Sequence, residues 1–82
     1  MLADYAAHRI VVGAKQSAKA VRAGCAVRVF LAADADPMLL APVEALCREH
    51  GVPTECGETM ARLGATAGIA VGAAVVCALR EE

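Results

Sequence analysis

The chain has 82 residues, of which 59% are hydrophobic, and its formal net charge is −1. A chain of this length forms one small domain, so we expect residues 1–82 to fold as a single unit with a modest core. Ample apolar surface with little net charge excludes disorder, and the acid–base balance excludes a uniformly basic coat for nucleic acid.

Charge is distributed unevenly along the chain. Residues 1–33 hold five cations and one acid, whereas residues 34–82 hold three cations and eight acids. Such asymmetry allows a local basic face on a nearly neutral body.

The four cysteines are Cys25, Cys47, Cys56 and Cys77, and their spacing matches no zinc-binding pattern. Two disulfides are an alternative, but no secretion signal opens the chain, and we expect reduced, mostly buried thiols in a cytoplasmic protein. The longest uncharged stretch, 63–79, falls short of the ~20 apolar residues that a membrane helix needs, so no membrane span is expected.

The first half of the chain alternates between helical and strand patterns. Residues 2–7 are compatible with a short helix, and the β-branched run over 9–12 predicts a strand. Residues 15–23 have helical composition and are followed by Gly24, a common residue after a helix. Alternating apolar residues predict a second strand over 27–32.

The second half continues the alternation. Asp36 has the pattern of a helix cap before Pro37, and the helix it begins is predicted over 37–50. A strand over 52–56 and a short helix over 59–65 follow. The last strand, over 71–79, is nearly all apolar and is therefore expected at the centre of the sheet. This order predicts an α/β fold, a three-layer α/β/α sandwich with a mixed four-stranded sheet.

Side chains suited to catalysis are sparse. His8, His50 and the single serine, Ser17, form no recognisable catalytic spacing with Asp34 or Asp36. The chain has neither a GxGxxG motif nor a P-loop, and no set of metal-ligand spacing is present. We therefore expect a protein that is not an enzyme and that uses no metal and no cofactor.

The turn that begins at Gly13 carries the clearest functional signal. Asp or Glu would stabilise a helix at its N-terminus, yet this helix begins with Lys15 and continues with Lys19 and Arg22 on the same face. Free backbone N–H groups beside two lysines suit a phosphate, and Gln16 can both donate and accept at a base edge. The alternative interpretation is a solvated basic helix face.

A second candidate segment is Gly68-Ile69-Ala70-Val71-Gly72. Its apolar residues between glycines fit either a strand entrance that packs inward or an exposed loop that stacks under unpaired RNA bases.

From residue 9 to residue 79 the chain resembles the ribosomal protein L7Ae family of kink-turn RNA-binding proteins, and within it the small bacterial members of the YbxF type. The matching segments are Gly13-Ala-Lys-Gln-Ser-Ala-Lys-Ala20, Asp34-Ala-Asp-Pro37, Leu63-Gly64 and Gly68-Ile-Ala-Val-Gly-Ala73. The resemblance implies an α/β/α sandwich that binds kink-turns, which are RNA duplexes bent at a three-nucleotide bulge beside tandem sheared G·A pairs.

The resemblance also implies where the RNA would lie. The turn from Gly13 to Gln16 would meet the G·A pairs, Lys19 would reach a phosphate or guanine, and 69–71 would cover the bulged nucleotides. Met60 stands where archaeal and eukaryotic members tend to place a lysine. Pattern and resemblance together predict these RNA-binding residues: Gly13, Ala14, Lys15, Gln16, Lys19, Arg22, Asp36, Leu40, Ile69, Ala70 and Val71, with Asp36 and Leu40 beside a flipped base.

The prediction is a non-catalytic monomer whose partner is an RNA that contains a kink-turn, such as ribosomal RNA or a riboswitch. The alternative is a protein–protein interaction module on the same fold, because some relatives of this fold act chiefly through protein partners. A small enzyme is the least favoured hypothesis, since the chain lacks a credible nucleophile, base or metal set.

Overall fold

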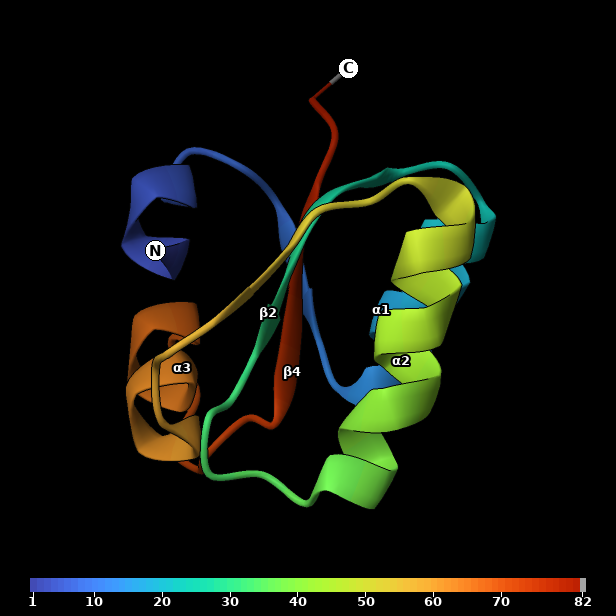
Figure 1. Cartoon of the computed structure of the whole chain (residues 1–82). Helices are drawn as coiled ribbons and strands as arrows, with labels where there is room; N and C mark the ends of the chain where they lie inside the picture. The colour runs from blue at the N-terminus through green and yellow to red at the C-terminus, as the bar shows by residue number, and fades with distance from the viewer. Residues whose placement is uncertain (82) are drawn as a thin grey trace.

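The computed structural model describes residues 1–81 and arranges them in three layers (Figure 1). A four-stranded sheet carries α1 and α2 on one face and the 3₁₀ turn η1 and α3 on the other. The predicted α/β/α sandwich is confirmed. In chain order the elements are η1 (Leu2–Tyr5), β1 (Ile10–Val12), α1 (Ala14–Arg22), β2 (Ala26–Leu31), α2 (Pro37–His50), β3 (Thr54–Cys56), α3 (Met60–Ala67) and β4 (Val75–Leu79).

The sheet is mixed, with strand order β1-β4-β2-β3. β4 runs antiparallel to both of its neighbours, whereas β3 runs parallel to β2. The residues from Val75 to Ala78 are all buried, because helices cover both faces of this strand. The expected central position of the last strand is confirmed.

The strand register gathers four chain segments at one end of the sheet. Val12 pairs with Val76 in β4, and Leu31 pairs with both Val75 and Cys56. The last residues of β1, β2 and β3 therefore lie at the same end of the sheet as the first residue of β4. The starts of α1, α2 and α3 and the loop before β4 consequently meet at this end, which is the lower end in Figure 1.

Three predicted elements differ clearly from those observed. The strand expected over 52–56 spans only Thr54–Cys56, because the N–H of Val52 donates to the carbonyl oxygen of Cys47 at the end of α2. The strand expected over 71–79 begins only at Val75, because residue 73 bonds to α3 instead of to a strand. The N–H of Ala73 donates to the carbonyl oxygen of Met60 at 3.0 Å. The helix expected over 2–7 is a single 3₁₀ turn.

Side-chain caps set the starts of α2 and α3. The Asp36 carboxylate accepts the N–H of Met38 at 2.9 Å, with Pro37 in the first turn, as predicted. The Thr59 hydroxyl accepts the N–H of Arg62 at 3.1 Å and caps α3. Each cap satisfies an N–H group that has no acceptor within its own helix.

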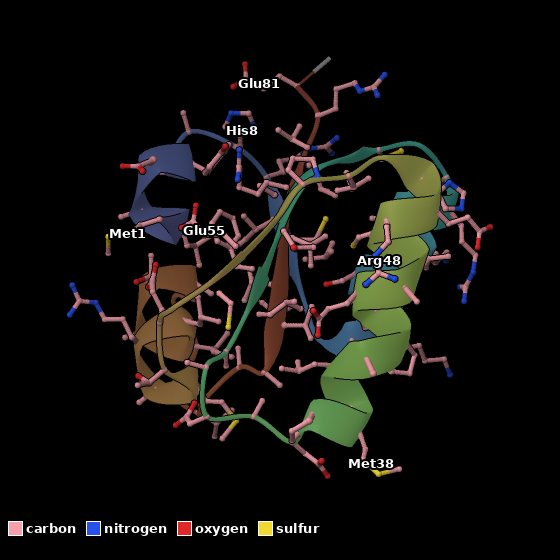
Figure 2. All side chains as sticks on the ribbon, viewed as in Figure 1. Met1, His8, Met38, Arg48, Glu55 and Glu81 are labelled. Atoms are coloured by element: carbon pink, nitrogen blue, oxygen red, sulfur yellow. The ribbon has the colours of Figure 1, made fainter. Side chains whose placement is uncertain are left out.

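An aromatic cluster holds η1 on the sheet. The Tyr5 ring lies 5.5 Å from Phe30 and 5.1 Å from His8 between ring centres, in edge-on geometry, and Arg28 Nε donates to its hydroxyl at 2.9 Å. His8 Nδ1 donates to the carbonyl oxygen of Leu79 at 2.9 Å. His8 therefore joins the segment before β1 to the end of β4 (Figure 2), which fits a structural role.

All four cysteines are free. Cys47 and Cys77 are buried, but Cys25 and Cys56 are exposed, so the expectation of mostly buried thiols holds for only two of them. Burial raises the pKa of Cys77 to about 11 and keeps this thiol protonated.

Within residues 1–81, no helix is long and apolar enough to cross a membrane, and no cluster of three or more His, Cys, Asp or Glu side chains is placed to hold a metal.

Candidate nucleic-acid interface

The start of α1 is an open helix N-terminus. Gly13 precedes the helix with φ 105°, a conformation that side chains rarely adopt, and it turns the chain from β1 into α1 within one residue. No side chain caps this helix, and its first turn holds no acid. The N–H groups of its first turn have no acceptor within the helix, so they are available to an anion.

The helix α1 has one basic face and one buried face. Lys15, Gln16 and Lys19 are exposed, whereas Ser17 and Val21 are fully buried. The buried side chains fix the rotation of the helix, because they pack toward the sheet. The lysines therefore project outward, on the face that their spacing predicted.

Arg22 lies at the other end of α1. Seven residues separate it from Lys15, which corresponds to about 10 Å along a helix axis. It lines a shallow hollow of about 230 Å³ together with Pro42, Leu46 and Glu49. Arg22 is thus placed at the margin of the candidate interface, close to an acid of α2.

The loop after α3 combines an inward and an outward apolar residue. Gly68 ends α3 with φ 83°, and the N–H of Ile69 donates to the carbonyl oxygen of Gly64 at 3.0 Å. Ile69 is partly buried and packs against the core, whereas Ala70 is exposed and Val71 is 72% exposed. The segment therefore has an inward-facing residue at Ile69 and outward-facing residues at Ala70 and Val71, and its contact with RNA bases stays a prediction.

Backbone hydrogen bonds hold the loop beside the start of α1. The N–H of Gly13 donates to the carbonyl oxygen of Val75 at 2.8 Å, directly after the loop. The N–H of Ala32, at the end of β2, donates to Ala74 at 2.9 Å. These bonds bring Ala74 and Val75, which directly follow the exposed loop residues, to the same end of the sheet as the start of α1, although more than 50 residues separate the two segments in sequence.

Close packing fixes the loop on α3. A Cβ added at Gly64 would overlap the carbonyl oxygen of Val71 and lie 3.0 Å from the Cα of Gly72. A Cβ added at Gly72 would lie 3.2 Å from the Cβ of Met60. The matching segments around Leu63-Gly64 and Gly68–Ala73 are therefore two sides of one contact.

The start of α2 differs from expectation at Leu40. Asp36 is exposed, as a contact residue must be, but Leu40 is only 8% exposed and belongs to the core. Leu40, Val43 and Cys47 are the buried residues of α2, and their i, i+3, i+7 spacing identifies its inner face. Leu40 therefore presents little side-chain surface to a flipped base.

Sequence reasoning missed two residues at this end of the molecule. Met38 is 82% exposed in the first turn of α2 (Figure 2) and lies off the buried face of that helix. The carboxylate of Asp34 accepts the N–H of Met60 at 2.8 Å. Helical periodicity could have identified Met38 as exposed, but no local pattern predicts a contact between residues 26 positions apart.

Comparisons with known proteins agree with this architecture. The ribosomal protein L7Ae/L30e/S12e/Gadd45 family matches residues 3–82. An "RNA-binding protein" of Bacillus pumilus is 41% identical over 70 residues, which are 85% of each chain. The "RNA-binding protein YbxF" of Geobacillus stearothermophilus is 40% identical over 74 residues, which are 90% of each chain.

Two solved structures share the fold. The Giardia lamblia 15.5kD RNA binding protein has a TM-score of 0.87 at 27% identity, and the match covers 99% of this chain and 69% of that one. A Bacillus halodurans protein of unknown function has a TM-score of 0.82 at 24% identity, with 96% and 78% of the two chains covered, and shows likeness of fold alone. The chain therefore belongs to the ribosomal protein L7Ae/L30e/S12e/Gadd45 family, as its residues predicted.

Proposed function

We propose that this protein is a non-catalytic RNA-binding protein that recognises kink-turns in structured RNA. The observation that carries the proposal is the bond from the Gly13 N–H to the Val75 carbonyl oxygen, at 2.8 Å. It holds the residue that follows the exposed apolar loop beside the open, basic start of α1. Several relatives are named as RNA-binding proteins, which supports the RNA-binding part of the proposal.

The start of α1 supplies the polar part of recognition. Its free N–H groups and the ammonium group of Lys19 attract phosphate, and Lys15 and Gln16 offer donors and an acceptor for the exposed edges of G·A pairs. Contacts with phosphate position the RNA, whereas contacts with base edges select it.

The loop supplies the apolar part. Val71 projects from a backbone that is bonded on both sides, to α3 and to the sheet. An exposed aliphatic side chain on a fixed loop can support the unstacked bases of a bulge, the kind of RNA feature that sequence-specific proteins usually recognise.

The charge of the surface predicts a modest salt dependence. Lys15, Lys19 and Arg22 are the cations of α1, and three neutralised phosphates give a slope of about −2 to −3 in the logarithm of the association constant against log salt. Much of the selectivity must then come from shape and base edges. We propose that the protein acts as a monomer, and a cytoplasmic location fits its free thiols, which suit a reducing compartment.

The test is a titration at fixed, stated salt with two RNAs. One contains a kink-turn, and in the other the tandem G·A pairs are changed to Watson–Crick pairs. We expect at least a hundredfold weaker binding to the second RNA, which is about 2.8 kcal/mol at ~1.4 kcal/mol per decade. Equal, weak binding to both would reduce the site to a basic patch and overturn the proposal in favour of a protein partner.

A pair of charge-matched variants locates the interface. Lys19→Ala removes a proposed phosphate or guanine contact, and we expect a loss of roughly 1–3 kcal/mol in binding. Arg48→Ala removes an equal charge from the last turn of α2, which lies about 16 Å along the helix from its start at the interface. We expect little change for Arg48→Ala, and equal losses in both variants would contradict the assigned surface.

A further inference from the structure

We propose that Asp34 is a positioning residue that holds the RNA-binding loop in place through α3. The inference rests on the function proposed above, and it concerns a residue that no pattern in the sequence linked to the loop. Asp34 lies between β2 and α2, whereas the loop precedes β4.

Asp34 bonds directly to the start of α3. Its Oδ1 accepts the N–H of Met60, the first residue of that helix, at 2.8 Å. A carboxylate is well placed at a helix N-terminus, because the helix dipole and the free N–H groups there favour negative charge. The first turn of α3 contains no acid of its own, so Asp34 supplies this interaction from another element.

Met60 in turn contacts the loop. The carbonyl oxygen of Met60 accepts the N–H of Ala73 at 3.0 Å, and a Cβ added at Gly72 would lie 3.2 Å from the Cβ of Met60 and 3.3 Å from its carbonyl group. The N–H of Met60 thus bonds to the Asp34 carboxylate, while its carbonyl group contacts residues 72 and 73. A displacement of Met60 would therefore disturb the loop that carries Val71.

Asp34 itself is held by its neighbours. The N–H of Ala33 donates to the carbonyl oxygen of Glu58 at 2.8 Å, and the N–H of Ala32 donates to Ala74 at 2.9 Å. These bonds fix the residues before Asp34 to the segments that enter α3 and β4. The backbone that carries the Asp34 carboxylate is therefore held in place by its neighbours.

The helix α3 does not depend on Asp34 for its own start. Thr59 caps it separately, through the N–H of Arg62 at 3.1 Å. Removal of the carboxylate should accordingly loosen the position of Met60 and the loop without unfolding the helix.

The two possible roles of Asp34 predict opposite changes in RNA affinity when its charge is removed. Asp34 is an exposed acid at the end of the molecule that is proposed to bind RNA, and an acid with no other role there repels phosphate. Its removal would then tighten binding. If Asp34 positions the loop, its removal weakens binding instead.

The experiment compares three variants with the unmodified protein. Asp34→Ala removes the acceptor and the charge, Asp34→Asn removes the charge but keeps an oxygen that can accept the Met60 N–H, and Glu44→Ala removes an exposed acid of α2 as a charge control. Binding to the two RNAs is titrated at several salt concentrations. Amide hydrogen exchange is followed over residues 69–73 in the free protein.

For Asp34→Ala we expect faster exchange in the loop, a tenfold or greater loss of kink-turn affinity and an unchanged salt slope. Asp34→Asn should bind within about threefold of the unmodified protein, and Glu44→Ala equally well or slightly more tightly. Unchanged loop exchange with equal or tighter binding by Asp34→Ala would overturn the proposal. A salt slope reduced by about one would overturn it as well, since the variant would then have altered a phosphate contact.

Two further provisions keep the outcomes separate. If Asp34→Ala does not fold, the same measurements on Asp34→Ser test whether Asp34 positions the loop. The serine oxygen lies one bond nearer the backbone and should not reach the N–H of Met60. Exchange in the free protein needs no RNA. If the unmodified protein fails to distinguish the two RNAs, the proposed function falls, while the exchange data still decide whether Asp34 holds the loop.

Discussion

Gly64→Ala tests whether the contact between α3 and the loop governs both stability and binding. Alanine is favoured over glycine inside a helix by about 1 kcal/mol, so a rule based on the helix alone predicts a stabilised protein. Gly64 is buried, however, and a Cβ there would overlap the Val71 carbonyl oxygen and lie 3.0 Å from the Gly72 Cα. Both obstacles are backbone atoms, which cannot rotate away.

The magnitude follows from these opposing effects. Overpacking in a dense site costs about 1–3 kcal/mol, which exceeds or cancels the helix gain, so we expect a net loss of up to about 2 kcal/mol. Against a total stability of about 4–12 kcal/mol for 82 residues, the variant should still fold. Because the loop must move outward, we also expect weaker binding to the kink-turn RNA.

The assay is urea unfolding followed by RNA titration, with Ala65→Gly as the matched control. Ala65 is an exposed residue of the same helix, so its change to glycine should cost about 1 kcal/mol from helix propensity alone and leave binding intact. A Gly64→Ala protein that is about 1 kcal/mol more stable and binds normally would refute the reasoning.

Two other predictions concern the loop and the thiols. Val71→Asp places a charge on a residue that is 72% exposed, so we expect about a tenfold loss of RNA affinity with stability unchanged within about 0.5 kcal/mol. Ile69→Asp should instead lower the free energy of unfolding. Equal stability losses in the two variants would contradict the assignment of Val71 as an outer and Ile69 as an inner residue. With a thiol reagent at pH 8, exposed Cys25 and Cys56 should react and buried Cys47 and Cys77 should react only on unfolding. Burial raises the pKa of Cys77 from 9.0 to about 11, so the unfolded chain loses this proton at a lower pH than the folded protein does. The free energy of unfolding should therefore fall from pH 9 toward pH 11. Urea midpoints that do not change over this range would contradict the raised pKa of Cys77.

The caps and periodicities of individual elements were predictable from the sequence. Asp36 before Pro37 indicated the start of α2, and the apolar character of the last strand indicated its central position. Lys15 and Lys19 at a helix start indicated an anion site. Each of these signals lies within a few neighbouring residues, where helix geometry, capping and burial act directly on residue type.

The assembly of the interface depended on contacts that no local pattern contains. The sequence left Ile69 and Val71 open between a buried strand and an exposed loop, and it placed the strand four residues too early. The structure decides both, because α3 takes the hydrogen bond of Ala73 and the core takes Ile69.

The sequence by itself therefore determined the alternating elements, the family and the basic helix start of this protein. Only the tertiary structure decided that the loop before β4 lies beside Gly13, that Leu40 faces inward while Met38 faces outward, and that Asp34 bonds to Met60. The physical reason is the sequence separation over which each kind of interaction acts. Propensities, caps and periodicity act between residues a few positions apart, whereas the interface is made by hydrogen bonds and packing between residues that only the closed sheet brings together.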